Sequence, residues 1–201
     1  MHQSSFEQMK RFRDSYLAGR EKERLKIFDL GSCDINGSYR PIFNKHLWSY
    51  QGLDLEKGPN VDILLKDPYR LAEIRSSSAD VFISGQVFEH IEYFWITMLE
   101  IARVLKTGGL CCIIAPSSGY EHRYPVDCWR FYPDGFSALA RFACLEPKEI
   151  YTIQDKDCEK FADESIKWKD TVMICIKPKW SWWSWMKITI VNRMLYKSIT
   201  G

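Results

Sequence analysis

Apolar and polar positions follow two different periods along the chain. In the first segment, apolar residues recur three to four positions apart among charged ones: Phe6, Met9, Phe12, Tyr16 and Leu17. This period predicts an amphipathic helix over residues 4–19, ended by Ala18 and Gly19. Its apolar face would lie on the rest of the protein as a cover.

Further along, short apolar runs alternate with helical segments. The strand-like runs are residues 26–30, 49–53, 61–65, 79–84 and 110–115, and the helical segments are residues 92–105 and 133–142. This alternation predicts a parallel sheet with helices on both faces. Two more strand candidates, residues 149–153 and 171–176, are separated by a charged, loop-like stretch. Because no clear helical crossover joins them, this end of the sheet can be antiparallel.

Length and composition limit the number of domains. The chain has 201 residues, of which 46% are hydrophobic, enough for one substantial core but not for two ordinary domains. We expect one domain over residues 1–178, with the covering helix in residues 1–24, and a separate tail over residues 179–201. The formal net charge of +2 gives no reason to expect a nucleic-acid partner.

The cysteine pattern and the absence of long apolar segments predict a location in the cytoplasm. The chain has seven cysteines, an odd number, and they are scattered: Cys33, Cys111, Cys112, Cys128, Cys144, Cys158 and Cys175. None forms a Cys-x-x-Cys pair or has a histidine at zinc-ligand spacing. They predict free thiols in a reducing cytoplasm and no metal site. The N-terminus has no apolar signal-peptide core, and no stretch approaches the ~20 apolar residues that span a bilayer.

A glycine-containing turn follows the first strand candidate, and we expect a helix after this turn. The segment reads Ile27-Phe28-Asp29-Leu30-Gly31-Ser32-Cys33-Asp34-Ile35-Asn36-Gly37-Ser38. Gly31 and Gly37 lack a Cβ, so they permit positive φ angles and the close approach of a nucleoside and an amino-acid group. Since any strand-to-helix turn favours glycine, the end of the second strand matters more. Asp54 stands there, at about the 20-residue spacing that places a carboxylate on ribose hydroxyls.

Three motifs in this order resemble the class I methyltransferases that use S-adenosyl-L-methionine (SAM), in their small-molecule group. They are Asp29-Leu30-Gly31, Glu89-His90-Ile91 and Arg103-Val104-Leu105-Lys106-Thr107-Gly108-Gly109. The resemblance covers about residues 25–177. It implies SAM as the cofactor, S-adenosylhomocysteine (SAH) as the product, and a Rossmann-like doubly wound α/β sheet. The implied strand order is 3-2-1-4-5-7-6, with strand 7 antiparallel.

The resemblance also implies a cofactor site. The methionine part of SAM would lie among Asp29, Gly31 and Gly37, the ribose on Asp54, the adenine amine on Asp67, and the sulfonium near Gly85 and Gln86. Leu55 is a further residue of the expected cofactor site. One position departs from the group, because Cys33 stands where a glycine is usual. Hydrogen bonds there could come from Ser32, Asp34 or Asn36. Asp34 either recognises the methionine ammonium or is an ordinary turn aspartate.

Two other functions compete with methyl transfer. A nicotinamide-dependent oxidoreductase would need a Gly-x-Gly-x-x-Gly turn, which this chain lacks. A catalytically silent methyltransferase-like partner subunit would bind SAM without turnover on any acceptor. Intact Asp29, Gly31 and Asp54 argue against the silent subunit.

Candidate catalytic residues follow the fourth and fifth strands. Methyl transfer needs a base only when the acceptor is protonated, as a hydroxyl is. His90, Tyr124 and Asp127 are the candidates, each with a structural alternative, which for Asp127 is an ion pair with Arg130. Residues 117–132 mix aromatic and charged side chains, which suits a sugar or planar ring. The run at 125–135 also resembles methyltransferases of surface-polysaccharide synthesis, which favours a small-molecule or saccharide acceptor.

The C-terminal tail is basic and rich in tryptophan. Residues 177–201 have no carboxylate side chain and contain Trp180, Trp182, Trp183 and Trp185. Tryptophan with lysine favours a membrane interface or a docking surface. The alternative is a tail that packs on the domain, since Lys187 and Lys197 fall near the same helical face as Met186 and Ile190.

Overall fold

A single mixed sheet forms the centre of the computed structural model, which describes residues 2–154 and 165–200. Its strands are β1 (Leu25–Leu30), β2 (Trp48–Asp54), β3 (Ile63–Leu64), β4 (Ala79–Gly85), β5 (Leu105–Pro116), β6 (Glu146–Thr152) and β7 (Asp170–Ile176). The order is β3-β2-β1-β4-β5-β7-β6, and β7 runs antiparallel to both β5 and β6. The α/β class, the strand order and the antiparallel strand 7 are therefore confirmed.

The central strands are apolar because both of their faces are covered. In β4 and β5, side chains that point to opposite faces are alike buried, as Phe82 and Ile83 illustrate. The parallel strands β1, β2 and β4 end together at one edge, at Leu30, Asp54 and Gly85. Loops that leave this carboxyl edge form the candidate site.

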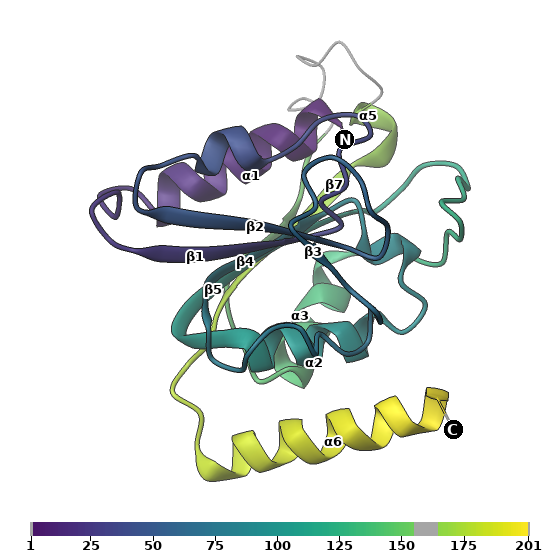
Figure 1. Ribbon diagram of the computed structural model, residues 1–201. Helices are drawn as coiled ribbons and strands as arrows, with labels where there is room; N and C mark the ends of the chain where they lie inside the picture. Colours follow the sequence, from purple (N-terminus) through teal and green to yellow (C-terminus); the bar gives the residue numbers. More distant parts are fainter. Residues whose placement is uncertain (1, 155–164, 201) are drawn as a thin grey trace.

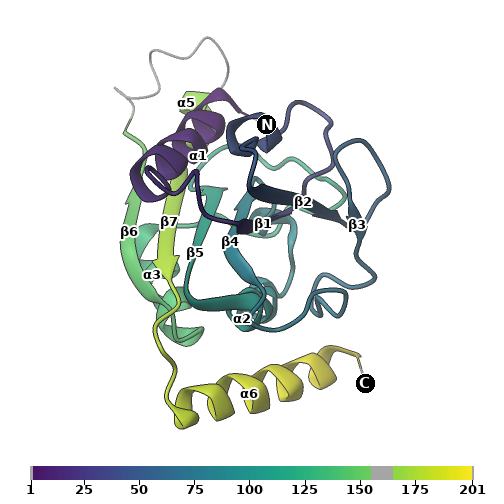
Figure 2. The ribbon, with the colours of Figure 1, turned by 60° about the vertical axis from the view of Figure 1, so that its left-hand side comes forward.

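Helices cover the two faces of the sheet unequally. The predicted N-terminal helix is present as α1 (Gln3–Tyr16), and it lies across one face with the short 3-10 helix η1 (Arg40–Phe43) (Figure 1). The opposite face carries α2 (Phe94–Val104) and α3 (Pro133–Phe142) (Figure 2). Met9 and Phe12 of α1 are fully buried, which confirms the covering role of this helix.

The turn after β1 does not lead into an α-helix, contrary to the sequence prediction. Residues 31–47 are irregular apart from η1. Pro41 lies in the first turn of η1, and Gly37 has a φ of +123°, a backbone angle that an α-helix does not allow. Tyr39, Ile42 and Phe43 still bury their side chains against the sheet. This face is thus covered by α1 and packed loop side chains.

The C-terminal tail forms a long helix, α6 (Trp182–Thr200), which packs outside α2 (Figure 2). Ile188 is buried against the core, and Asn192 Nδ2 donates a hydrogen bond to Glu100 Oε1 at 2.6 Å. Just before the helix, Trp180 Nε1 donates to the carbonyl oxygen of Cys144 at 2.8 Å. Trp182, Trp183, Trp185, Ile190 and Met194 stay exposed. Over residues 2–154 and 165–200, no helix is both long and apolar enough to cross a membrane.

Candidate active site

The glycine turn after β1 is the first part of the site. Gly31 has a φ of +76°, and the N–H groups of Gly31 and Ser32 both donate to the carbonyl oxygen of Leu53, at 2.8 and 3.1 Å. A Cβ on Gly31 would lie 2.1 Å from Cγ2 of Val87. Glycine is therefore required here both by its backbone angle and by the close approach of the segment after β4.

Asp54 lies at the end of β2, beside this turn. Its Oδ2 accepts a hydrogen bond from the N–H of Cys33 at 2.9 Å, and its Oδ1 accepts one from the N–H of Glu56 at 3.1 Å. Asp54 is partly exposed, and the neighbouring Leu55 is exposed. The two ends that the sequence analysis paired, Gly31 and Asp54, are thus brought together at the carboxyl edge.

Asp29, the last residue but one of β1, is buried, with 2% of its surface exposed. The hydroxyl of Tyr50 donates to its carboxylate. Burial raises the pKa of Asp29 to about 7, against the opposing effect of the Tyr50 hydrogen bond. The Asp29 carboxylate is therefore buried next to the turn and hydrogen-bonded to Tyr50 of the neighbouring strand β2.

Asp34 and Asp67 each have local hydrogen-bond partners. Oδ1 of Asp34 accepts a hydrogen bond from the N–H of Gly37 at 2.8 Å, the geometry of an ordinary turn aspartate. Asp67 accepts bonds from the N–H of Tyr69 at 2.7 Å and from the hydroxyl of Tyr196 at 2.6 Å. A ligand on Asp67 would have to share it with Tyr196 of α6.

The side chain of Tyr39 links the end of β4 to the beginning of α1. A Cβ on Gly85 would lie 2.1 Å from the hydroxyl oxygen of Tyr39, so this position also requires glycine. The Tyr39 hydroxyl is hydrogen-bonded to that of Ser5 at 2.6 Å. Gln86 has a φ of +62°, and its Nε2 donates to Asp170 Oδ1 at 2.9 Å.

Polar residues that the sequence analysis missed complete this part of the site. Ser4 Oγ donates to Oδ2 of the same Asp170 at 2.8 Å, and both residues are buried. Ser4 and Ser5 are adjacent polar residues at the start of an otherwise amphipathic helix, and this was the available signal. Through Tyr39 and Asp170, the hydroxyl groups in the first turn of α1 are therefore linked to the end of β4.

Glu89 and His90 follow β4 in the short 3-10 helix η2 (Phe88–His90). Nδ1 of His90 lies 2.6 Å from the carbonyl oxygen of Val126. Because a carbonyl only accepts, Nδ1 carries the proton and Nε2 keeps a lone pair. Burial lowers the pKa of His90, which favours this neutral form.

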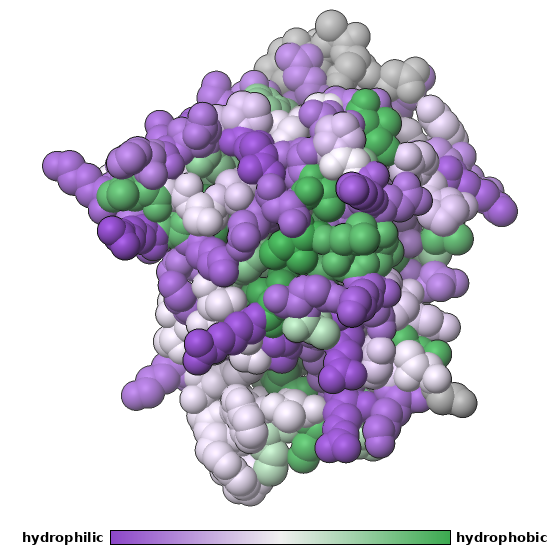
Figure 3. Space-filling model, viewed as in Figure 1, coloured by the Kyte–Doolittle hydropathy of each residue, from purple (hydrophilic) through white to green (hydrophobic). Residues whose placement is uncertain are grey.

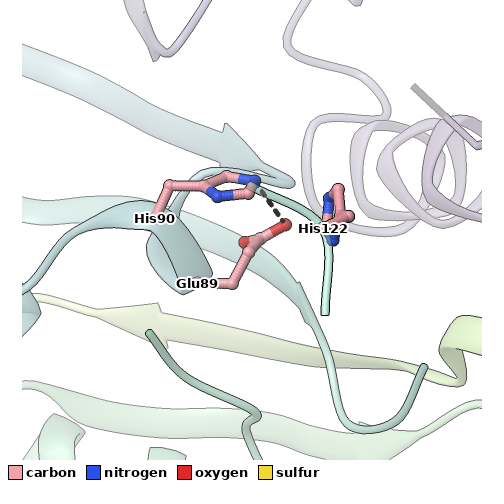
Figure 4. A group of neighbouring side chains, drawn as sticks. All are labelled: Glu89, His90 and His122. Carbon is pink, nitrogen blue, oxygen red and sulfur yellow. Dashed lines mark ion pairs between the residues drawn. The ribbon is translucent and has the colours of Figure 1, made fainter. Parts of the chain in front are cut away.

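The loop after β5 brings a second histidine to His90. The ring centroids of His90 and His122 are 5.0 Å apart, and the carboxyl group of Glu89 points toward both rings (Figure 4). The carbonyl oxygen of Glu89 holds the loop in place, accepting from the N–H groups of Cys128 and Trp129 at 2.7 and 3.2 Å. His122 lies within residues 117–132, and no sequence pattern singled it out from that group.

Asp127 forms the ion pair that was the alternative to a catalytic role. Its two oxygens accept hydrogen bonds from Nη1 and Nη2 of Arg130 at 2.5 and 2.8 Å, and Oδ2 also accepts from the N–H of His122 at 2.7 Å. The Arg130 guanidinium holds the pKa of Asp127 well below its usual range. This geometry favours a positioning role. The third candidate, Tyr124, is exposed on the same loop.

Apolar surface accompanies these polar groups. Figure 3 shows an apolar area near the middle of the face seen in Figure 1, around β3, framed by hydrophilic side chains. Ile35, Leu55 and Leu64 are among the exposed apolar residues in the segments that meet at this edge. The edge can therefore offer an apolar surface as well as carboxylates to a ligand.

Solved structures share this arrangement of strands and helices. A Burkholderia thailandensis 1,6-didemethyltoxoflavin-N1-methyltransferase, with bound 1,6-didemethyltoxoflavin and SAH, has a TM-score of 0.67 at 13% identity, covering 88% of this chain and 79% of that chain. The protein bound to the Trm112 methyltransferase activator of Haloferax volcanii has a TM-score of 0.59 at 17% identity, covering 88% and 95%. The Haemonchus contortus phosphoethanolamine N-methyltransferase 2, in complex with SAM, has a TM-score of 0.59 at 15% identity, covering 77% and 49%.

The chain has the fold of the class I methyltransferases. In sequence, residues 29–113 match the family described as a methyltransferase domain. That match begins at Asp29 and spans the glycine turn, Asp54, Glu89 and His90. No curated protein matches the chain by sequence. The methyltransferase fold and the domain match together support SAM-dependent methylation.

Proposed function

We propose that this protein transfers a methyl group from SAM to a hydroxyl oxygen of a small-molecule or saccharide acceptor. The observation that carries the proposal is the position of Asp54. Its carboxylate stands beside the turn at Gly31, at the carboxyl edge, within the segment that matches a methyltransferase domain. A carboxylate at the end of the second strand is suited to the two ribose hydroxyls of a nucleoside.

The cofactor would lie across the ends of β1, β2 and β4. We place the methionine part over Gly31, Ser32 and Gly37, with Asp29 beneath. We place the ribose on Asp54 and the adenine against the exposed side chain of Leu55. Asp34 is a weaker candidate because it has the geometry of an ordinary turn aspartate, and Asp67 is weaker because the side chain of Tyr196 from α6 lies against it.

The methyl group would face the end of β4, near Gly85, Gln86 and His90. Transfer to oxygen is an in-line displacement, for which alignment of the two reactants can supply ~7–11 kcal/mol. The acceptor O–H loses its proton, the oxygen attacks the methyl carbon, and the carbon–sulfur bond breaks to leave SAH. The lone pair on Nε2 of neutral His90 is the proton acceptor that the hydrogen-bond geometry best supports.

Aromatic side chains support a ring-shaped acceptor. Tyr120, Tyr124 and Trp129 are exposed on the loop that follows β5. Flat aromatic faces next to polar groups suit a sugar, which has both C–H faces and hydroxyls. The link to surface-polysaccharide synthesis rests on the sequence run at 125–135 alone.

A silent partner subunit remains the second candidate. One protein of similar fold, described as a putative methyltransferase, forms a complex with a methyltransferase activator, so a chain of this fold can work together with a partner subunit. An oxidoreductase is less well supported, because the turn lacks the three glycines of a dinucleotide site.

A thermal-shift screen tests the acceptor class. We expect SAH to raise the melting temperature, and a saccharide or other hydroxyl-bearing acceptor to raise it further only when SAH is present. Ligands that bind the folded state stabilise it by mass action, and a completed ternary site binds the acceptor more tightly. A subsequent assay of methyl transfer with the stabilising compound separates an enzyme from a silent subunit, which would bind both ligands without turnover.

The exposed tryptophans of α6 support docking on a membrane surface or on another protein. The protein would otherwise be cytoplasmic. Trp182, Trp183 and Trp185 are exposed at the start of the helix, and the tail is basic. Such a surface suits the interface of an anionic membrane. We expect full-length protein to float with anionic liposomes more than a chain ending at Pro178. Equal recovery of the two proteins would contradict the membrane proposal.

A further inference from the structure

Three potential metal ligands meet beside the proposed position of the methyl group. Glu89 and His90 come from η2 after β4, and His122 comes from the loop after β5 (Figure 4). One ligand atom from each residue lies within 4.8 Å of the other two. The sequence does not show this cluster, because neighbouring Glu89 and His90 are separated from His122 by more than thirty residues.

Glu89 is the feature that most requires an explanation. Its side chain is 0% exposed, and both carboxylate oxygens lack a hydrogen-bond partner among the described residues. A buried carboxyl group without partners is unfavourable, and native proteins satisfy such groups with a proton donor or a cation. The nearby guanidinium of Arg130 is already paired with Asp127. The Glu89 oxygens are therefore left free for a cation.

Contacts with neighbouring residues orient the rings of both histidines for metal binding. The hydrogen bond between Nδ1 of His90 and the carbonyl oxygen of Val126 fixes the tautomer that leaves the lone pair on Nε2, which lies 3.7 Å from Glu89 Oε1. Metal-binding histidines commonly carry such a bond on the second ring nitrogen. The His122 ring is held edge-on to Trp168, with centroids 4.5 Å apart, and its Nδ1 lies 3.4 Å from Oδ2 of Asp127.

We propose that Glu89, His90 and His122 bind a divalent transition-metal ion of the zinc type. Two imidazoles and one carboxylate are a known ligand set for catalytic zinc, which leaves a fourth position open. Zinc bonds of 2.0–2.2 Å place tetrahedral ligand atoms roughly 3.3 Å apart. Glu89 and His90 are already close to that separation, and His122, on a surface loop, closes the site by a small rotation.

The open position gives the ion a role in catalysis, and this part rests on the proposed function. An acceptor hydroxyl bound to the ion becomes more acidic, so its proton passes to water and the oxygen becomes nucleophilic. That oxygen then takes the methyl group, the carbon–sulfur bond breaks, and SAH is released. His90 would in this case bind the ion instead of accepting the proton itself.

Zinc binding can be measured without SAM or an acceptor. Metal-free protein, kept reduced, is titrated with Zn²⁺ in competition with a chromophoric chelator, and Co²⁺ serves as a spectroscopic probe of ligand geometry. We expect one Zn²⁺ per chain, bound at least about 100-fold more weakly by Glu89→Gln and by His122→Gln. His46→Gln, at an exposed histidine elsewhere, is expected to bind like the parent protein.

Circular dichroism establishes that each variant is folded. The proposal is overturned if the parent protein binds no stoichiometric Zn²⁺, or if folded Glu89→Gln and His122→Gln bind as tightly as the parent, because cysteines or other groups would then hold the ion. Separate SAH titrations of the same proteins report on the cofactor site. A failure of the metal proposal is therefore distinguishable from a failure of the proposed methyl transfer.

Discussion

Replacing Asp54 with alanine is expected to weaken SAH binding at least about 100-fold. Two charge-assisted hydrogen bonds to the ribose, at ~1.5–3 kcal/mol each, would be lost. Each 1.4 kcal/mol corresponds to a factor of about ten in affinity. The loss of the Asp54 carboxylate also frees the N–H groups of Cys33 and Glu56, so the turn that shapes the site would loosen.

Calorimetric titration with SAH measures this effect, with two comparison variants. Asp134→Ala changes an exposed aspartate at the start of α3 and is expected to bind like the parent protein. Asp54→Asn keeps the shape of the side chain and is expected to give an intermediate affinity. If folded Asp54→Ala binds SAH as tightly as the parent, Asp54 does not hold the ribose.

The second large effect is expected for His90→Gln, which should lower turnover by ~10²–10⁴-fold and leave SAH affinity unchanged. The variant removes the Nε2 lone pair, which serves the acceptor either as a base or through a bound metal ion. It leaves Gly31, Asp54 and Leu55 in place. Methyl transfer is measured with the acceptor found in the thermal-shift screen, and SAH affinity is measured by calorimetry.

Comparison variants separate the roles within this cluster. Tyr124→Phe is expected to turn over at the parental rate, since Tyr124 is exposed. Asp127→Asn should lower the melting temperature through loss of the Arg130 pair. If His122→Gln and a chelator both reduce turnover as much as His90→Gln does, His90 acts through a metal ion. Parental turnover of His90→Gln would mean that alignment alone suffices.

The sheet was predictable from sequence because burial dictates composition there. The apolar runs of β1, β4 and β5 occupy strands with both faces covered, so hydrophobicity alone marked them. The sheet order came from the motif resemblance, since a run of apolar residues does not reveal its neighbours. The helix expected after β1 was wrong, because the large side chains of Tyr39 and Phe43 fill that face without a helix.

The site was only partly predictable. A local turn shows in the spacing of neighbouring residues, whereas a contact between distant segments leaves no such pattern in the sequence. Gly31 and Asp54 were identified because their spacing reflects the strand-turn-strand unit. The Ser5–Tyr39 contact and the Ser4–Asp170 contact join residues far apart in sequence, and no local pattern marks them. The meeting of His122 with Glu89 similarly depends on how one loop folds over another.

Calorimetric titration of SAH into the parent protein tests the central claim most directly. The account predicts one SAH bound per chain with micromolar-range affinity, together with a rise in melting temperature that increases with SAH concentration. Folded protein that takes up neither SAH nor SAM at millimolar concentration would contradict the assignment of a SAM-dependent methyltransferase.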